Sequence, residues 1–205
     1  MDLRHRFRKG FLRFLAPDAK LPPPETRLGE ILHAPLAAGQ TRAYVGMGSN
    51  LGDRAGNLLL GVRGMMNAGL RVVRLSSIYE TEPVGVAGEQ PAFLNMVAEL
   101  CGPLPTPGSL LARLLRVEYA LGRRREAHPA PRTIDLDLLL YGDKRSDTDY
   151  LRLPHPRLHL RRFVLAPLAE LEPQALHPTL RKSFSTLLAE STDASKVKLW
   201  KPERP

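Results

Sequence analysis

Cysteine and tryptophan are nearly absent from this chain, which has one of each, Cys101 and Trp200. A single cysteine excludes an intramolecular disulfide and any zinc site built from several cysteines. No apolar run is long enough to span a bilayer and no secretory signal is evident, so we expect a cytoplasmic protein. Aromatic residues make up only 6% of the chain, which leaves few rings for stacking on nucleic-acid bases.

Acidic residues are also in the minority. The 30 Lys and Arg residues outnumber the 21 Asp and Glu residues, and the formal net charge is +9. Such a balance indicates either a nucleic-acid surface or a site for anionic small molecules. The arginines cluster around one strand and near the N-terminus rather than along one helix face, which favours the small anionic ligand. The length of 205 residues, with 43% apolar and 25% charged residues, is typical of one main globular domain.

The segment from Pro131 to Tyr141 has the pattern of a strand, yet it contains two aspartates two residues apart, Asp135 and Asp137. Side chains at this spacing project from the same face of a strand, with Cα atoms roughly 7 Å apart. The apolar residues between them then pack into a core behind. Asp is depleted in strands and two like charges repel, so a cation should lie between them. Two carboxylates suit Mg²⁺, which often takes substrate phosphates as its other ligands. The alternative is a solvated face of an edge strand.

Cationic side chains flank this strand in the sequence. They are Arg123, Arg124, Arg125 and Arg132 on its N-terminal side, and His155, Arg161 and Arg162 on its C-terminal side. Arginines around a carboxylate pair fit a site where metal and guanidinium groups share a polyphosphate. Taken alone, the run from Arg123 to Arg125 is equally typical of a solvated helix end.

Residues 1–40 differ from the rest of the chain. Apolar residues recur there at helical spacing with basic residues between them, and a Lys-Leu-Pro-Pro-Pro segment follows at residues 20–24. This pattern predicts a short basic amphipathic helix and a stiff linker, before a main domain at residues 41–205. The helix resembles a membrane-surface or targeting segment. A poorly ordered extension without an assigned role is the alternative.

From Arg42 onward, strand and helix patterns alternate. We predict strands at 43–47, 71–79, 92–100 and 131–141. Helices are predicted from an Asp53 cap to Ala68, from a Thr106 or Ser109 cap to Tyr119, and at 163–171 and 180–189, with a breaker-rich loop at 80–91. Such alternation indicates an α/β or α+β fold with a central sheet covered by helices.

Two segments have the composition of ligand-binding loops. The glycines at Gly46, Gly48 and Gly52 follow a strand and precede a helix, but their spacing matches neither the dinucleotide pattern nor a P-loop, so only a tight turn is predicted. Further along, Phe93 and Asn95 share one strand face, an aromatic surface beside an amide that suits a flat heterocycle such as a pterin. A core Phe beside a turn-forming Asn is the alternative.

These motifs occur in one order that resembles the 6-hydroxymethyl-7,8-dihydropterin pyrophosphokinases of the folate pathway. They read Gly-Ser-Asn-Leu-Gly-Asp, Tyr-Glu-Thr-x-Pro-x-Gly, Gln-Pro-x-Phe-Leu-Asn, Leu-Gly-Arg-x-Arg, Pro-Arg-Thr-Ile-Asp-Leu-Asp-Leu-Leu, and Leu-Pro-His-Pro-Arg followed by Arg-x-Phe-Val-Leu-x-Pro-Leu. The resemblance covers about residues 42–178. It implies a ferredoxin-like fold with a mainly antiparallel sheet flanked by helices. It also implies transfer of the β,γ-diphosphate of ATP to the pterin hydroxymethyl group, with release of AMP.

The resemblance also implies roles for individual residues. Asp135 and Asp137 would bind two Mg²⁺ ions, and Arg125 and Arg132 would engage the triphosphate, so these four are the expected catalytic residues. His155 and Arg161 resemble the nucleotide-binding pair, and Glu118 and Arg123 line the same ATP region. The pterin pocket is implied for Thr81, Val84, Phe93, Asn95 and Phe163, with the two phenylalanines on either side of the ring.

One segment departs from the family pattern. The family usually has Trp-Gly just before Pro-Arg in a mobile loop, whereas this chain has Glu126-Ala127-His128-Pro129-Ala130. The change bears on lid closure but leaves the expected metal ligands in place. Two alternatives follow from the sequence: a degenerate homologue that binds pterin or nucleotide without turnover, and a basic nucleic-acid-binding protein. The expected enzyme has ATP and the pterin as small-molecule substrates, no nucleic-acid partner, and a monomeric state.

Overall fold

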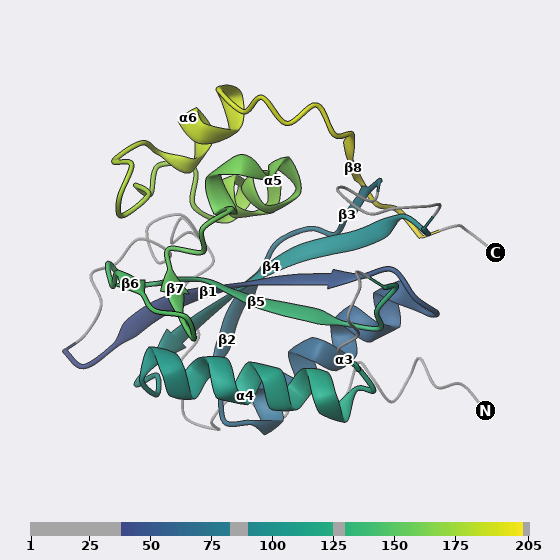
Figure 1. Ribbon diagram of the computed structural model, residues 1–205, viewed down its shortest axis with the longest axis horizontal. Helices are drawn as coiled ribbons and strands as arrows, with labels where there is room; N and C mark the ends of the chain where they lie inside the picture. Colours follow the sequence, from purple (N-terminus) through teal and green to yellow (C-terminus); the bar gives the residue numbers. More distant parts are fainter. Residues whose placement is uncertain (1–37, 83–89, 125–129, 203–205) are drawn as a thin grey trace, which may run out of the picture. The chain divides into compact units, whose positions relative to one another are not determined.

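The computed structural model describes residues 38–82, 90–124 and 130–202 (Figure 1). The predicted basic helix and the Pro-rich linker lie outside the described residues, and the domain boundary at residue 40 stays a prediction. Within the described ranges, no helix is both long and apolar enough to cross a membrane.

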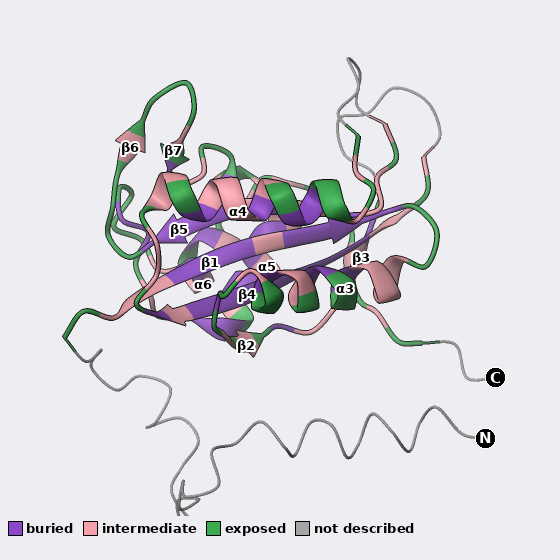
Figure 2. Cartoon of the chain, turned by 90° about the horizontal axis from the view of Figure 1, so that it is seen from below, coloured by how far each residue is buried: buried purple, intermediate pink, exposed green. Residues whose placement is uncertain are grey.

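One antiparallel sheet runs through the centre of the fold. Its strands are, in order across the sheet, β5 (Asp135–Tyr141), β1 (Thr41–Ser49), β4 (Phe93–Gly102), β3 (Tyr79–Thr81) and β8 (Val197–Leu199), with β2 (Val72–Leu75) also paired to β4. The strands β1 and β4 are the longest and are mostly buried (Figure 2). A second, two-stranded sheet consists of β6 (Ser146–Asp147) and β7 (Arg152–Leu153).

Helices cover both faces of the sheet. The helices α3 (Arg54–Asn67) and α4 (Pro107–Ala120) lie on one face, and α5 (Arg162–Leu171) and α6 (Phe184–Ala189) on the other, with a 3₁₀ turn at Leu158–Leu160 before α5 (Figure 1). Each face has its own apolar cluster, because alternate side chains of the central strands point to opposite layers. The predicted fold class, an antiparallel sheet flanked by helices, is confirmed.

Helix starts agree with the capping residues in the sequence. The Asp53 carboxylate accepts a hydrogen bond from the Gly56 amide at 2.9 Å, and Thr106, rather than Ser109, caps α4. The last predicted helix is shorter than expected. Ser183 caps α6, so the helix begins at Phe184 and not at residue 180.

The single strand predicted at 71–79 is wrong, because the structure has two strands there. Leu75 pairs with Ala98 and Tyr79 with Asn95, so one extra residue lies between β2 and β3. Ser76 causes this interruption, because its hydroxyl accepts a hydrogen bond from the Val97 amide at 2.9 Å. In a continuous strand a backbone carbonyl would accept that bond. The predicted loop at 80–91 also begins later than expected, because β3 extends to Thr81.

Candidate active site

The two aspartates of β5 lie on one face of the strand, as predicted. Asp135 pairs with Gly48 of β1 and Asp137 pairs with Gly46. Ile134, Leu136 and Leu138 are buried in the cluster against α3 and α4, so the carboxylates face the opposite layer, which contains α5.

Gly48 joins this acidic pair to the other predicted half of the site. It pairs with Asp135 on one side and with Asn95 of β4 on the other. Two strand spacings therefore separate Asp135 from Asn95, about 10 Å. A Cβ at Gly48 would lie 3.1 Å from Asn95 Oδ1, 3.7 Å from Phe93 Cδ1 and 3.9 Å from Asp135 Cβ. Because Gly48 has no side chain, the sheet surface between Asp135 and Asn95 is free for a ligand.

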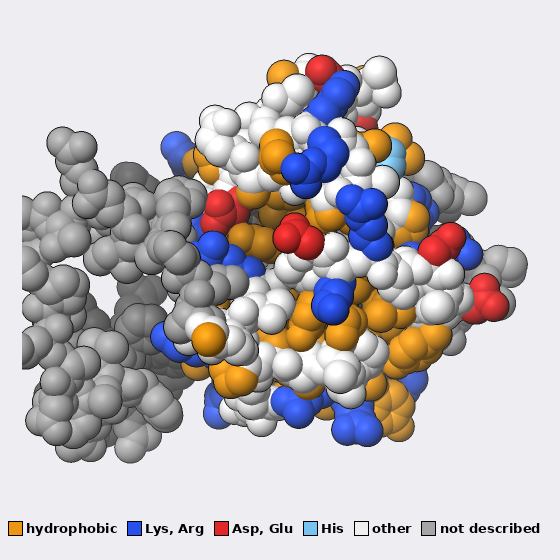
Figure 3. All heavy atoms as spheres, turned by 90° about the vertical axis from the view of Figure 1, so that its left-hand side faces the viewer, with side chains coloured by type: hydrophobic (Ala, Val, Ile, Leu, Met, Phe, Trp, Pro, Cys, Tyr) orange, Lys and Arg blue, Asp and Glu red, His pale blue; other side chains and the backbone are white. Residues whose placement is uncertain are grey.

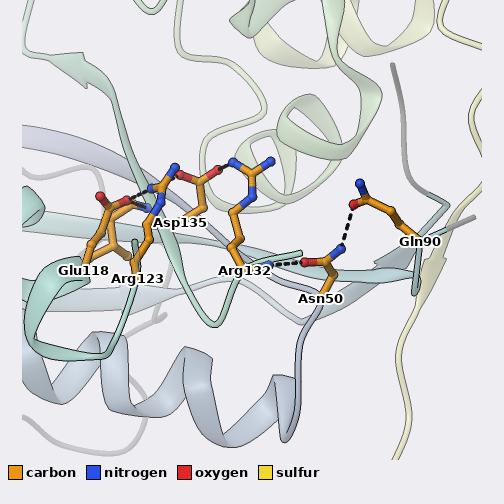
Figure 4. Close-up of polar contacts among 7 residues, drawn as sticks. Asn50, Gln90, Glu118, Arg123, Arg132 and Asp135 are labelled. Carbon is orange, nitrogen blue, oxygen red and sulfur yellow. Dashed lines mark hydrogen bonds and ion pairs between the residues drawn. The ribbon is translucent and has the colours of Figure 1, made fainter. Parts of the chain in front are cut away.

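Arginines hold both oxygens of Asp135 (Figure 4). Arg123 forms an ion pair with Oδ1, and Arg132 Nη1 lies 2.8 Å from Oδ2. The guanidinium carbon of Arg132 is 5.7 Å from the Phe93 ring centroid. In the described part of the chain, the buried Arg132 Nε has no hydrogen-bond partner. Arg132 therefore contacts both halves of the site and retains a donor that an anionic ligand would satisfy.

Glu118 supports this arrangement from the end of α4. It is only 3% exposed, forms an ion pair with Arg123, and accepts a hydrogen bond from the Leu136 amide at 2.7 Å. The Leu136 amide lies on the outer edge of β5, which pairs with no strand other than β1 in the described part of the chain. Burial raises the pKa of Glu118 to about 7, and the charge of Asp135 acts in the same direction. Glu118 thus braces the backbone between the two aspartates.

Ionisation of Asp137 is less favourable in the metal-free protein than ionisation of a solvated aspartate. Burial and the charge of Asp135 together raise its pKa to about 6, against the opposing effect of nearby arginines. A cation at the pair would lower the pKa of Asp137 and favour its charged form. Among the described residues, no cluster of three or more His, Cys, Asp or Glu side chains forms a complete metal site. Two carboxylates fit a Mg²⁺ ion that takes its remaining ligands from phosphate and water.

The predicted pterin side contains a preformed hydrogen bond. Asn95 Nδ2 donates to Thr81 Oγ1 at 2.8 Å, and both side chains are buried. This bond orients the Asn95 amide so that its Oδ1 faces Gly48. Phe93 precedes Asn95 on the same face. An aromatic surface and an oriented amide are therefore in place as the sequence predicted.

His155 and Arg161 lie on the α5 side of the sheet. The Arg157 amide donates to His155 Nδ1 at 3.2 Å, so neutral His155 has its proton on Nε2 and is able to donate it to a ligand. Burial lowers the pKa of His155 to about 4, and the charges of Arg161 and Arg157 add to this effect. The Arg161 guanidinium carbon lies 5.4 Å from the Phe163 ring centroid.

We expect His155 to make stability depend on pH. The unfolded chain takes up this proton near pH 6.5 and the folded chain only near pH 4, so acidification across this window destabilises the fold. The free energy of unfolding in urea should be measured at pH 7.5 and pH 4.5. Between these two values, His155→Gln should lose less stability than the wild type, by on the order of 2 kcal/mol. Parallel losses in the two proteins would contradict this prediction.

The structure brings together most of the predicted site residues. Ion pairs join Asp135, Arg123, Arg132 and Glu118 in one cluster, and Arg132 connects it to Phe93. Asp137 interacts electrostatically with Asp135 and both arginines. Arg125 and Val84 lie outside the described residues, as does most of the Trp-less loop. Whether Phe93 and Phe163 enclose a ring stays a prediction.

Sequence reasoning missed two residues that join the loops of the site. The Asn50 side chain contacts Arg132 and Gln90, and Arg54 Nη1 donates to Glu80 Oε1 at 2.9 Å and to the Ala92 carbonyl at 2.7 Å. Asn50 belongs to the Gly-Ser-Asn-Leu-Gly-Asp motif, but loop composition alone predicted only a turn there. Partners more than 25 residues away in sequence leave no local signal.

Comparison with known proteins agrees with this geometry. The family model described as 7,8-dihydro-6-hydroxymethylpterin-pyrophosphokinase (HPPK) matches residues 44–173. The 2-amino-4-hydroxy-6-hydroxymethyldihydropteridine pyrophosphokinase of Bacillus subtilis is 42% identical over 160 residues, covering 78% of this chain and 90% of that protein. The protein with the same description in Aquifex aeolicus is 37% identical over 149 residues, covering 73% and 91%.

Solved structures show the same fold. The Plasmodium falciparum HPPK-DHPS structure with pteroate superposes with a TM-score of 0.58 at 14% identity. The match covers 74% of this chain and 42% of that chain, so the chain spans less than half of the Plasmodium protein. The fold shared with these HPPK domains is the ferredoxin-like fold expected from the sequence. The matched family model, the curated relatives and the shared fold together place the chain in the 7,8-dihydro-6-hydroxymethylpterin-pyrophosphokinase family.

Proposed function

We propose that this chain transfers the β,γ-diphosphate of ATP to the hydroxymethyl group of 6-hydroxymethyl-7,8-dihydropterin in folate biosynthesis. The observation that supports this most directly is the placement of the acidic pair. Asp135 lies across Gly48 from the Asn95 amide, Asp137 lies on the same face of β5, and Arg132 contacts both sides. A phosphate-binding half and a half for a flat polar ring are therefore adjacent on one sheet.

The chemistry that such a site supports is an in-line displacement. The pterin hydroxyl oxygen forms a bond to the β-phosphorus, the bond from that phosphorus to the oxygen bridging to the α-phosphate breaks, and this oxygen leaves with AMP. The hydroxyl proton is lost to solvent. Negative charge grows on the leaving oxygen, and preorganised cations nearby stabilise it.

Asp135 and Asp137 are the residues proposed to hold two Mg²⁺ ions. When bound with ATP, the ions neutralise phosphate charge and favour ionisation of the attacking hydroxyl. Arg123 and Arg132 now occupy the oxygens of Asp135. Their guanidinium groups are proposed to exchange this carboxylate for phosphate oxygens, and the buried, unpartnered Nε of Arg132 supports that role.

The nucleotide side is proposed to lie around His155 and Arg161. Neutral His155 donates from Nε2, and Arg161 adds positive charge near Asp137. Glu118 is proposed to act mainly by holding Arg123 and the Leu136 amide in place. Its solvent exposure of 3% leaves little surface for a ligand to contact. Direct contact of Glu118 with ATP stays a prediction.

A product assay tests the proposed function. Purified protein is incubated with ATP, Mg²⁺ and 6-hydroxymethyl-7,8-dihydropterin, and the nucleotides are separated by chromatography. Pterin-dependent AMP is the expected result. ADP would indicate transfer of a single phosphoryl group and would contradict the proposal. Saturable pterin binding without turnover would support the degenerate homologue.

Gly48→Ala should weaken pterin binding more than ATP binding. The new methyl group would lie 3.1 Å from Asn95 Oδ1, on the sheet surface between Phe93 and Asp135. We expect the KM for the pterin to rise about tenfold, equivalent to 1.4 kcal/mol, with a smaller change in the KM for ATP. Gly108→Ala is the matched control, because its methyl group would make only an ordinary 3.7 Å contact with Tyr150. If the KM for the pterin is unchanged in Gly48→Ala, Gly48 does not line the pterin site.

No observation favours the nucleic-acid alternative. On the face of the molecule in Figure 3, Lys and Arg side chains are dispersed among apolar ones and form no continuous stripe. The cytoplasmic location, the monomeric state and a membrane contact by the N-terminal segment stay predictions.

A further inference from the structure

Asn50 is a buried polar residue to which the proposed function assigns no role. It is 1% exposed and lies in the loop between β1 and α3. Its Oδ1 accepts a hydrogen bond from the Arg132 amide at 2.7 Å, and its own amide donates to the Arg132 carbonyl at 3.1 Å. Its Nδ2 donates to Gln90 Oε1 at 3.3 Å (Figure 4). It also donates to the Pro91 carbonyl at 3.4 Å.

These bonds connect segments that belong to different halves of the site. Arg132 immediately precedes β5, and its guanidinium group holds Asp135 on the phosphate side. Pro91 lies two residues before Phe93, where the pterin side begins. The segments are separated by about forty residues in the sequence, and within the described residues the Asn50 side chain bonds to both of them.

Asparagine suits this position because it offers an acceptor and a donor on one short side chain. Aspartate retains the acceptor for the Arg132 amide but loses the donor to Pro91. Alanine loses both and leaves the partly buried Arg132 amide and Pro91 carbonyl without this partner. The two substitutions therefore separate the bond toward the phosphate side from the bond toward the pterin side.

We propose that Asn50 is a positioning residue that sets the placement of Arg132 relative to the pterin-binding strand. It acts through the backbone of Arg132 and Pro91 and contacts neither substrate. This inference rests on the proposed function. A displacement of about 1 Å in a group that positions a substrate is enough to lower a rate about 100-fold, so loss of this link should be visible in kinetics.

Asn57 provides a matched control for the alternative that Asn50 merely stabilises the loop. Its Nδ2 donates to the Leu51 carbonyl at 2.8 Å and to Ser49 Oγ at 3.3 Å. Leu51 belongs to the same loop as Asn50 and Ser49 is the last residue of β1, and neither lies in the segments of Arg132 or Pro91. Asn57→Ala therefore removes loop hydrogen bonds without the link between the two halves.

The test measures pterin-dependent AMP release and urea unfolding for the wild type, Asn50→Ala, Asn50→Asp and Asn57→Ala. Asn50→Ala should lower kcat about 30-fold, and Asn57→Ala less than threefold at similar stability. Asn50→Asp should keep kcat within about fivefold of the wild type while the KM for the pterin rises about tenfold. The aspartate variant has the same shape, so it remains informative if the alanine variant does not fold.

A double-mutant cycle with Arg132→Ala separates positioning from general destabilisation. Without the guanidinium group, Asn50→Ala should lower kcat less than threefold, because nothing on the phosphate side remains to be positioned. Equal losses of kcat in both backgrounds, or losses matching Asn57→Ala, would overturn the inference and leave the proposed function intact. A wild-type protein that releases no pterin-dependent AMP would overturn both.

Discussion

Asp137→Asn should lower kcat at least 1000-fold while the protein stays folded. The asparagine has the same shape but cannot supply the negative charge that we propose holds Mg²⁺ at the reacting phosphates. A 1000-fold loss corresponds to about 4 kcal/mol of transition-state stabilisation, within the several kcal/mol expected for metal-ion catalysis. The measurement is the rate of AMP formation at saturating ATP and pterin.

The same variant should be more stable than the wild type in the absence of Mg²⁺. The folded-state pKa of Asp137 is raised from 3.8 to about 6, so the folded chain binds its proton more tightly than the unfolded chain does. The stability of the metal-free fold therefore falls as the pH rises from about 4 to about 6 and stays lower above that, and the asparagine removes this penalty. We expect a gain of about 2 kcal/mol at pH 7.5 that disappears near pH 4.

Asp147→Asn is the control for this variant, because Asp147 lies exposed on β6 and, among the described residues, forms an ion pair only with Arg152, at 3.3 Å. It should leave the rate of AMP formation unchanged and alter stability by less than about 0.5 kcal/mol. Asp137→Asn with a rate within tenfold of the wild type would contradict the metal assignment. If Asp137→Asn is less stable than the wild type at pH 7.5, the charge of Asp137 does not destabilise the metal-free fold.

Arg132→Ala should lower kcat about 1000-fold, and Arg132→Lys about 100-fold. Arginines that stabilise a transferring phosphoryl group contribute factors of this size. Lysine retains the charge but cannot form the planar fork that now contacts Asp135 and lies over Phe93. Both variants keep the backbone bonds to Asn50, so the loss would report on the guanidinium group itself.

Arg152→Ala and Arg152→Lys are the matched controls, since Arg152 is exposed and its ion pair with Asp147 belongs to the separate β6–β7 sheet. Neither should change kcat by more than about twofold. If Arg132→Lys retains full activity, simple charge is sufficient at this position. If Arg132→Ala does so, Arg132 has no role in transfer.

Local features of the fold followed from the sequence. The alternation of Ile134, Asp135, Leu136 and Asp137 predicted which side chains share a face, because strand geometry repeats every two residues whatever the strand pairs with. The Asp53 and Thr106 caps placed the starts of α3 and α4, because a cap bonds within three residues of itself. Both signals depend only on neighbours in the chain.

Predictions failed where a distant partner decides the local structure. Ser76 divides the predicted strand because its hydroxyl meets the Val97 amide, and β8 exists because β3 provides an edge for it. Neither Ser76 nor the segment from Val197 to Leu199 has a strong local preference that reveals this. Pairing between strands is a property of two segments together.

The sequence by itself determined the family, the antiparallel sheet with its helices, and the two aspartates on one face of β5. The tertiary structure alone decided that Gly48 lies between Asp135 and Asn95, that Glu118 braces the Leu136 amide, and that Asn50 joins Arg132 to Pro91. Strand register and buried side-chain hydrogen bonds join residues that are far apart in the chain. They form only when the packing of the whole domain brings those residues together, so no local pattern encodes them.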